Sequence, residues 1–391
     1  MLAAPGQGAQ TPGFLQPWLE LPGLRDRLTW WSAVTGLDLV YYGTEAPAEE
    51  IRDTAVAQPL LVASGLAAAD ALFGHLTDTP HCVGATAGHS VGELTAGVLS
   101  GTLTPEAALV LVRERGRAMA QAATATETSM SAVLGGDPDE VLAALERHGL
   151  TPANINGAGQ IVAAGTAEQL AAFAEDPPAK ARLRPLSVAG AFHTHHMSPA
   201  VDTLRQLAAG APVNAPETRL LSNLDGAAVE SGREFLDRLV QQVSAPVRWD
   251  ACTRTMIDLG VSAVIELPPA GTLTGIARRA LTGVETLALK TPDNLDAARA
   301  LVAAHTATVG EYEPEWRLLV APLAGTFQAG AHQPGGSIEP GTELGRVAAR
   351  REAHPVTCSY GASIVEWLVA DGDPVSAGQP VVRLQPEVVP A

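Results

Sequence analysis

The chain has 391 residues and a formal net charge of −17, with 46% hydrophobic and 17% charged residues. This composition is that of a globular protein, and a chain of this length is expected to form two or three compact units. The negative mean field disfavours nucleic acid and anionic membranes as partners, because both would be repelled. The first residues include neither a basic region nor a long apolar run, so we expect no membrane anchor and a cytoplasmic location.

The cysteines argue against a covalent or metal framework. Cys82, Cys252 and Cys358 lie far apart and match no metal-ligand spacing. We therefore expect packed thiols, with neither disulfides nor a metal site.

The first part of the chain predicts alternating strands and helices. A short apolar start runs into a glycine-rich turn at residues 5–10, and residues 58–73 have the spacing of a mostly buried helix. A strand-like run at residues 82–87 stops at a turn over residues 88–92, and a helix-compatible segment begins at Glu93. Strand, tight turn and helix in that order predict an α/β layer architecture with a mainly parallel sheet.

A new series of short strand and helix patterns begins near residue 126 and predicts an inserted subdomain. The expected elements are strand 130–134, helix 138–148, strand pair 153–164, helix 167–175 and strand 182–188. This βαββαβ order predicts a small ferredoxin-like subdomain at residues 126–188, inserted into a core made of residues 1–125 and 189–308.

The C-terminal part predicts a different kind of unit. Residues 309–318 are polar and proline-bearing, as in a linker. Beyond them helical patterns disappear, and residues 363–369 and 375–384 are expected to form short strands joined by tight turns. An imperfect repeat of this pattern begins at Gly341. We expect a small all-β module at residues 319–386.

Residues 88–92, Gly-His-Ser-Val-Gly, match a nucleophile elbow. In this motif a serine occupies a strained strand-to-helix turn, and the glycines allow close backbone approach. The backbone N–H of Val91 and the helix dipole could then stabilise an oxyanion after Ser90 attacks a thioester. The pattern also occurs in structural turns, but the strand before it and the helix after it favour catalysis.

A serine nucleophile needs a base, and histidine is the usual one near neutral pH. In this architecture the base follows the serine, which points to His193, His195 and His196. At least two of these three are bystanders, and the residues alone do not choose among them.

With these motifs in view, the first three quarters of the chain resemble malonyl-CoA:acyl carrier protein transacylases. The collinear match comprises residues 5–10, 58–59, 88–92, 115–117, 154–156, 159–160, 190–193 and 271–275. The resemblance implies an α/β-hydrolase-like core, with Ser90 as nucleophile and His193 as base. It further implies that the backbone carbonyl of Gln242 orients the histidine and that the N–H groups of Gln7 and Val91 form the oxyanion hole.

Arg115 decides the expected substrate class. Alone, the stretch with Arg113, Arg115 and Arg117 reads as an exposed helix face. The resemblance instead places Arg115 in the pocket, where its planar fork can hold a malonyl carboxylate. It implies transfer of malonyl from malonyl-CoA, through a seryl ester, to the phosphopantetheine thiol of an acyl carrier protein, with no cofactor.

Further residues are implied to contact the substrate. Phe192 is similar to the residue that precedes the histidine in malonyl-type relatives, where its bulk should crowd an α-methyl branch. Gln58, Asn154 and Asn156 are expected substrate-binding residues, although asparagines in loops are as often turn formers.

Carrier proteins are generally acidic, so docking on this acidic chain needs a local positive patch. The candidates are Lys180, Arg182, Arg184, Arg278 and Arg279. A solvated charged face is the alternative interpretation.

Residues 319–384 resemble biotinyl/lipoyl carrier domains, with one important departure. The stretch matching the cofactor-bearing hairpin reads Ala-Ala-Arg-Arg at residues 348–351, and the last lysine of the chain is Lys290. Guanidinium does not replace a lysine amine as an acyl acceptor, so we expect neither biotin nor lipoate to be attached. The expected role of the module is docking, dimerisation or tethering.

Three alternatives remain at this stage. An acyl hydrolase could use the same Ser90 and His193 to clear carriers, although Arg115 argues against it. A scaffold could act mainly through the C-terminal module. An ordinary esterase would suit the elbow motif, but not the glycine-rich opening turn or residues 154–156.

Overall fold

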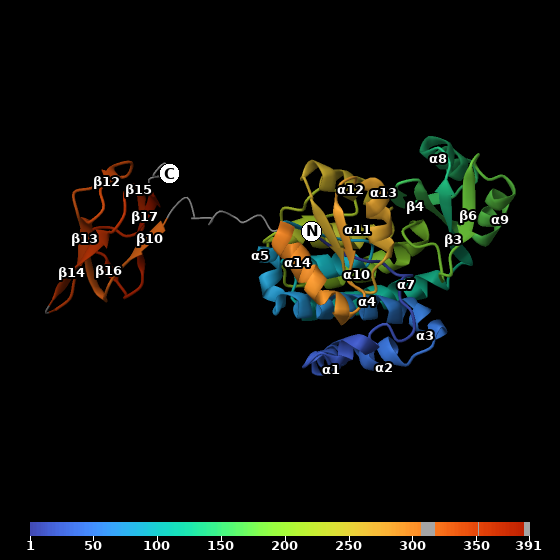
Figure 1. Cartoon of the computed structure of the whole chain (residues 1–391), viewed down its shortest axis with the longest axis horizontal. Coiled ribbons are helices and arrows are strands. Elements are labelled where there is room, and N and C mark those ends of the chain that lie inside the picture. Colours follow the sequence, from blue (N-terminus) through green and yellow to red (C-terminus); the bar gives the residue numbers. More distant parts are fainter. Residues whose placement is uncertain (306–316, 351, 387–391) are drawn as a thin grey trace. The chain divides into compact units, whose positions relative to one another are not determined.

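The computed structural model describes residues 1–305, 317–350 and 352–386. The chain forms two compact units, Met1–Thr306 and Ala307–Ala391, with separate hydrophobic cores. Figure 1 shows the first unit as a helix-covered sheet with a smaller subdomain at one end, and the second as a small unit of strands.

A five-stranded parallel sheet forms the centre of the first unit, in the order β7-β2-β1-β8-β9. The strands are β1 (Leu2–Ala4), β2 (Ala85–Gly88), β7 (Arg219–Leu221), β8 (Ala263–Glu266) and β9 (Glu285–Ala288). They are short, and the three central strands β2, β1 and β8 are buried at every position, as expected for a parallel sheet covered on both faces.

Alternate residues of the strands enter different cores, because successive side chains of a strand point to opposite faces. Leu2 and Ala4 pack with α4, α6 and α7, whereas Ala3 packs with α12 and α13. The helices of this unit are α1 (Leu24–Thr35), α2 (Leu39–Thr44), α3 (Ala48–Arg52), α4 (Thr54–Phe73), α5 (Thr79–Cys82), α6 (Gly92–Leu99), α7 (Pro105–Ala123), α10 (Ser198–Gly210), α11 (Gly232–Gln242), α12 (Trp249–Asp258), α13 (Thr272–Ala280) and α14 (Leu295–His305). Short 3-10 turns occur at Gln16–Glu20, Leu76–Asp78, His195–Met197 and Pro292–Asn294.

Helix α4 is the central buried helix. The Asp53 side chain accepts a hydrogen bond from Ala55 N and so caps its N-terminus. By length and composition α4 is apolar enough to cross a bilayer, but 78% of its most apolar stretch is buried inside the protein. Such burial is typical of the core helix of a globular unit.

The subdomain is a four-stranded antiparallel sheet in the order β4-β5-β3-β6. Its elements are β3 (Thr128–Gly135), α8 (Pro138–Arg147), β4 (Thr151–Gly157), β5 (Gln160–Thr166), α9 (Ala167–Glu175) and β6 (Ala181–Pro185). Strand β4 also binds the core, because Ile155 N donates to Val247 O and Val247 N donates to Ala153 O, both at 2.9 Å. The edge of the subdomain sheet is thereby fixed to the segment that leads into α12.

The second unit has two four-stranded antiparallel sheets, β10-β17-β15-β12 and β14-β13-β11-β16, around the buried Phe327 and Leu344. The strands are β10 (Arg317–Val320), β11 (Gly325–Ala329), β12 (Ser337–Ile338), β13 (Thr342–Ala348), β14 (Ala353–Cys358), β15 (Ala362–Trp367), β16 (Pro374–Val375) and β17 (Pro380–Pro386). The stretch expected at the hairpin tip joins β13 to β14, and its Arg351 lies outside the described residues.

Several expected boundaries were wrong. The predicted strand 182–188 ends at Pro185, and the predicted strand stretch 375–384 is divided between β16 and β17. The predicted helix 58–73 begins earlier, at Thr54, because the cap at Asp53 sets its start. The predicted strand 82–87 covers β2 only in part, since Cys82 ends α5. Most of the predicted linker 309–318 lies outside the described residues, but Arg317 and Leu318 belong to β10, where they pair with Leu384 and Arg383 of β17.

Candidate active site

The nucleophile elbow joins β2 to α6 through a very close backbone crossing. A Cβ added to Gly88 would lie 1.9 Å from the Gly92 carbonyl carbon, and one on Gly92 would lie 2.2 Å from Ala4 O. Only glycine fits at both positions. Ser90 itself has φ of 53°, a left-handed conformation that is costly for a residue with a side chain.

Ser90 and His193 form a hydrogen-bonded dyad. The Ser90 Oγ lies 2.7 Å from His193 Nε2, and His193 Nδ1 lies 2.7 Å from Gln242 O. Because a backbone carbonyl only accepts, Nδ1 carries the imidazole proton and Nε2 accepts the serine proton. His193 is therefore in the tautomer that a general base requires. His195 and His196 lie in the next 3-10 turn, outside this contact.

Arg115 enters the same site from α7 and is almost fully buried. Its Nη1 donates to Gln58 Oε1 and its Nη2 to Gln242 Oε1, both at 2.7 Å, while Nη2 also lies 3.3 Å from Ser90 Oγ. Two side-chain carbonyls thus fix the guanidinium beside the nucleophile. Neither is an ion, and the acidic group that interacts electrostatically with this guanidinium is the buried Glu93.

Burial governs the charges of the site. Desolvation lowers the pKa of His193 to about 3, and the nearby Arg115 charge acts in the same direction. Desolvation also lowers the pKa of Arg115 to about 10 and raises that of the buried Glu93 to about 8. At neutral pH the site therefore combines a neutral imidazole with a charged guanidinium that is not matched by a fully ionised carboxylate.

The turn after β1 lies against the elbow. A Cβ on Gly6 would approach both Nδ1 and O of His89 to 3.0 Å. Within the described part of the chain, the N–H groups of Gln7 and Val91 have no hydrogen-bond acceptor. An oxyanion hole requires unpaired N–H donors, and both groups meet that condition.

The remaining predicted substrate residues differ in their contacts. Phe192 is buried directly before His193. Asn156 Oδ1 lies 2.9 Å from His89 Nε2, whereas the buried Asn154 Oδ1 has no partner within the described structure. Asn154 therefore offers a free acceptor, while Asn156 is already engaged with the elbow.

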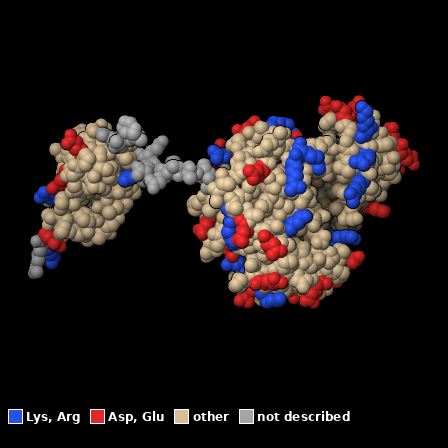
Figure 2. All heavy atoms as spheres, viewed as in Figure 1, with Lys and Arg blue, Asp and Glu red and all other residues tan. Residues whose placement is uncertain are grey.

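The five basic candidates, Lys180, Arg182, Arg184, Arg278 and Arg279, are all exposed. The first three lie on or just before β6, and the last two lie in the final turn of α13. Figure 2 shows basic side chains over both elements, with a hollow between the core and the subdomain.

Comparison with known proteins identifies the family. The family model described as "Acyl transferase domain" matches residues 29–331. The Malonyl CoA-acyl carrier protein transacylase of Mycobacterium tuberculosis is 51% identical over 300 residues, which are 75% of this chain and 97% of that protein. The Escherichia coli K12 protein of the same name is 32% identical over 76% of this chain and 97% of its own length. The chain belongs to the malonyl CoA-acyl carrier protein transacylase family.

Solved structures of the family agree. The crystal structure of MCAT from Mycobacterium tuberculosis superimposes with a TM-score of 0.73 at 50% identity, covering 76% of this chain and 98% of that chain. A type II PKS acyl-carrier protein in complex with its malonyl-transacylase, at 28% identity, has a TM-score of 0.70 and covers 77% of this chain and 98% of that chain. About a quarter of this chain lies beyond each alignment.

Two residues that hold the site together were missed by the sequence interpretation. Asn223, just after β7, accepts a hydrogen bond from Ser90 N and donates one to Gly88 O, both at 2.8 Å. Glu93 accepts hydrogen bonds from Gln242 Nε2 and Asn223 N. The position of Asn223 at the carboxyl end of a parallel strand was the available signal, because β1 and β2 also end at the site.

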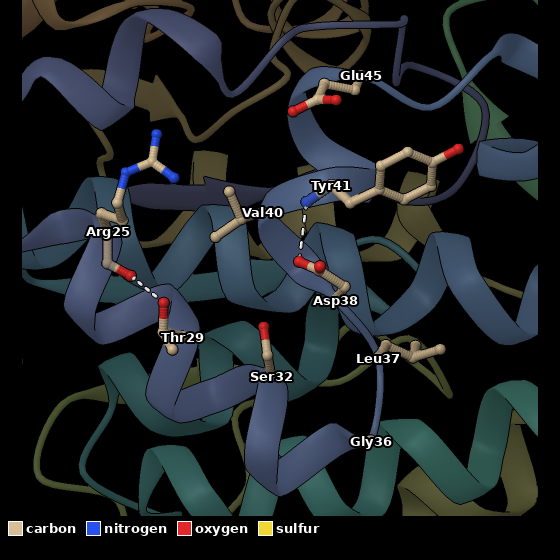
Figure 3. Close-up of a pocket in the computed structure, with 9 residues that line it drawn as sticks. All are labelled: Arg25, Thr29, Ser32, Gly36, Leu37, Asp38, Val40, Tyr41 and Glu45. Carbon is tan, nitrogen blue, oxygen red and sulfur yellow. Dashed lines mark hydrogen bonds between the residues drawn. The ribbon is translucent and has the colours of Figure 1, made fainter.

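A separate groove of about 750 Å³ lies between α1 and α2 (Figure 3). Its lining includes Arg25, Thr29, Asp38 and Tyr41. Thr29 Oγ1 donates to Arg25 O, and Asp38 caps α2 by accepting from Tyr41 N. The groove is lined by neither Ser90 nor His193 nor Arg115. The two hydrogen bonds named above stabilise α1 and the start of α2 and do not point to a ligand.

Proposed function

We propose that this chain transfers a malonyl group from malonyl-CoA, through an ester on Ser90, to the phosphopantetheine thiol of an acyl carrier protein. The pathway is fatty acid or polyketide synthesis, and the location is the cytoplasm. The observation that carries the proposal is the buried Arg115 guanidinium, 3.3 Å from the Ser90 Oγ. A cation so close to the nucleophile suits an acyl group whose carboxylate lies only two bonds from the reacting carbonyl carbon.

The first half-reaction loads the enzyme. The Ser90 Oγ attacks the thioester carbonyl while His193 Nε2 takes its proton. The N–H groups of Gln7 and Val91 stabilise the resulting oxyanion. The carbon–sulfur bond then breaks, and His193 returns the proton to the departing coenzyme A thiolate, leaving a malonyl ester on Ser90.

The second half-reaction reverses these roles. His193 takes the proton of the carrier thiol, the sulfur attacks the seryl ester, and Ser90 leaves with the proton from His193. Arg115 holds the malonyl carboxylate in both steps and so keeps the ester carbonyl in one pose. The chemistry needs no metal or other cofactor, because each step is a proton transfer or an acyl transfer.

Other side chains supply specificity. The bulk of Phe192, directly before His193, disfavours an α-methyl branch, and Gln58 fixes Arg115. Asn154 is assigned to substrate binding as well: its Oδ1 is buried and has no partner in the described structure, and it accepts an N–H of the pantetheine arm once its side chain turns outward. Asn156, on the same strand β4, contacts the elbow through His89.

Docking of the acidic carrier uses the exposed basic residues on β6 and α13. Lys180, Arg182 and Arg184 lie on or just before β6, and Arg278 and Arg279 lie in the last turn of α13. Figure 2 shows basic side chains over these elements and a hollow between the core and the subdomain. Complementary charge at this position steers the carrier and favours its encounter rate more than its final affinity.

The two smaller parts of the fold receive finer assignments. The β4-β5-β3-β6 order, with α8 and α9, supports a ferredoxin-like class for residues 126–188. The two antiparallel sheets of residues 317–386 support a biotinyl/lipoyl-like module. The hairpin after Ala348 offers arginine where such modules have an acceptor lysine, so no biotin or lipoate is attached. The module then acts in docking, dimerisation or tethering to a partner, and the malonyl transfer itself does not depend on it.

The test is transfer of radiolabel from malonyl-CoA, with and without a holo carrier protein. Ser90→Ala should abolish labelling of both enzyme and carrier, whereas Ser64→Ala should not. Ser64 is a matched buried serine on α4 whose Oγ donates to Leu61 O. If free malonate is released equally fast without carrier, the protein is a hydrolase and not a transferase. If no seryl ester forms at all, both the transferase and the hydrolase assignments are refuted.

The module has its own test. The Mycobacterium tuberculosis relative aligns over 97% of its length with 75% of this chain. That relative therefore corresponds to about three quarters of this chain, and the other quarter has no aligned part in it. We expect a chain ending at His305 to keep the malonyl transfer rate of the whole protein. A large loss of transfer to the carrier, with seryl ester formation intact, would assign carrier docking to the module.

A further inference from the structure

Gln242 contacts three parts of the catalytic centre. Its backbone oxygen accepts the His193 Nδ1 proton, and its side-chain oxygen accepts from Arg115 Nη2. Its side-chain nitrogen donates to Ser90 O and Asn223 Oδ1, each at 3.1 Å, and to Glu93. One residue therefore joins the base, the arginine and the nucleophile turn.

The orientation of this amide matters, because its two ends have opposite hydrogen-bonding character. A guanidinium only donates, so the oxygen of Gln242 has to face Arg115. The nitrogen end then requires acceptors, and Glu93 supplies the only carboxyl group among its partners in the described structure. With the amide reversed, an NH₂ group would face the Arg115 guanidinium.

Glu93 itself is held by two donors. One carboxyl oxygen accepts from Gln242 Nε2 and the other from the backbone N–H of Asn223. A carboxyl group can accept through both oxygens whether or not it carries a proton, whereas an amide has only one accepting oxygen. The side chain is 1% exposed, so water cannot replace a missing acceptor.

We infer that Glu93 is a positioning residue that sets the malonyl preference of the enzyme, by fixing the Gln242 amide with its oxygen toward Arg115. The inference rests on the proposed malonyl transfer and extends it to a residue that touches neither the substrate nor Arg115 directly. Through Asn223, which accepts from Ser90 N, the same carboxyl group also supports the nucleophile turn.

Glu93→Gln tests the inference, because it keeps the shape and removes one acceptor. Its NH₂ group must face either Gln242 or the Asn223 N–H. In the first case the Gln242 amide reverses or loses its partner, and in the second Asn223 loosens. We expect the ratio of kcat/KM for malonyl-CoA to that for acetyl-CoA to fall about tenfold, mainly through KM for malonyl-CoA.

Glu266→Gln is the matched control. Glu266 is equally buried, and its carboxyl group accepts from the N–H groups of Gly271, Leu273 and Thr274, none of which contacts the dyad or Arg115. Its malonyl-to-acetyl ratio should equal that of the wild type. Because the ratio is taken within one sample, loss of folded protein cancels out.

Glu93→Asp keeps an acceptor but withdraws it by one methylene, so its ratio should lie between those of wild type and Glu93→Gln, and it serves if the glutamine variant does not fold. The inference is overturned if the malonyl-to-acetyl ratio of Glu93→Gln lies within twofold of the wild-type ratio. It is also overturned if the ratio of Glu93→Asp is lower than that of Glu93→Gln. Neither result affects the malonyl transfer proposed for the wild type. A wild type without malonyl preference overturns the proposed function itself.

Discussion

Arg115→Ala is the most informative single change in this protein. In the wild type the guanidinium is buried, keeps two side-chain carbonyls as fixed acceptors and lies beside the nucleophile. Removing one partner of a buried, hydrogen-bonded charge pair costs about 2–5 kcal/mol. At 1.36 kcal/mol per factor of ten, kcat/KM for malonyl-CoA should fall about 30- to 5,000-fold.

Acetyl-CoA has no carboxylate for Arg115 to hold, so its kcat/KM should fall far less. The assay is seryl ester formation from each thioester under single-turnover conditions. Arg115→Lys should be intermediate, because an ammonium keeps the charge but cannot hold both Gln58 and Gln242 in a planar fork. Arg117→Ala, an exposed arginine on the same helix, is the control and should behave as wild type.

The Ala variant should also be less stable, since the buried oxygens of Gln58 and Gln242 lose their donor. Stability and selectivity are separable, because only the latter compares two substrates in one sample. Equal losses with malonyl-CoA and acetyl-CoA would refute the assignment of Arg115 to the acyl carboxylate.

Three further predictions concern charge and backbone. Because burial lowers the pKa of His193 to about 3, the imidazole is neutral throughout the range from pH 5 to 8, and kcat/KM for ester formation should show no histidine limb near 6.5; a limb there would contradict the buried base. The Glu93 pKa of about 8 lies above its ordinary value of 4.5, so the stability that its neutral form contributes is complete below pH 4.5 and is lost as the pH rises from there through 8. The free energies of unfolding of wild type and Glu93→Gln should be measured by denaturant titration at pH 5 and pH 8. The advantage of the wild type over the variant should be larger at pH 5, and an advantage that does not change with pH would count against the raised pKa of Glu93. Gly88→Ala should yield little soluble protein, because its Cβ would overlap the Gly92 carbonyl, whereas Gly84→Ala meets nothing within 4 Å and should express as wild type.

The elbow and its flanking elements were accessible to sequence reasoning because their signals are local. Residues 88–92 carry the serine and both glycines, and a strand and a helix flank them as expected. The choice of His193 over His195 and His196 was not local. It came from family resemblance, and in three dimensions it depends on Gln242, 49 residues further along the chain.

Arg115 shows where periodicity would have helped. The buried positions of α7 include Leu111, Val112, Arg115, Met119 and Ala122, which lie on one helix face. An arginine on an otherwise apolar stripe is a sequence signal of a buried, functional charge. Its neighbour Arg117 lies about 200° away around the helix and is exposed, so the charged stretch hid two different environments.

The contacts of Glu93 and Asn223 could not be predicted in the same way. Helix α6 is buried on all sides, so no face of its sequence is marked as special. Asn223 meets Ser90 across 133 residues of sequence, through the neighbouring positions of β2 and β7 in the sheet. Only the strand order brings these residues together.

Ser90 and His193 both adopt left-handed backbone angles, with φ of 53° and 61°. Each such conformation costs about 1–3 kcal/mol in a residue other than glycine, and the surrounding fold has to sustain that cost. The two residues proposed to perform the chemistry thus both hold an unfavourable backbone conformation. Under selection for robustness alone, glycine would be favoured at both positions, and descendants that had abandoned catalysis would keep the scaffold while losing these two side chains first.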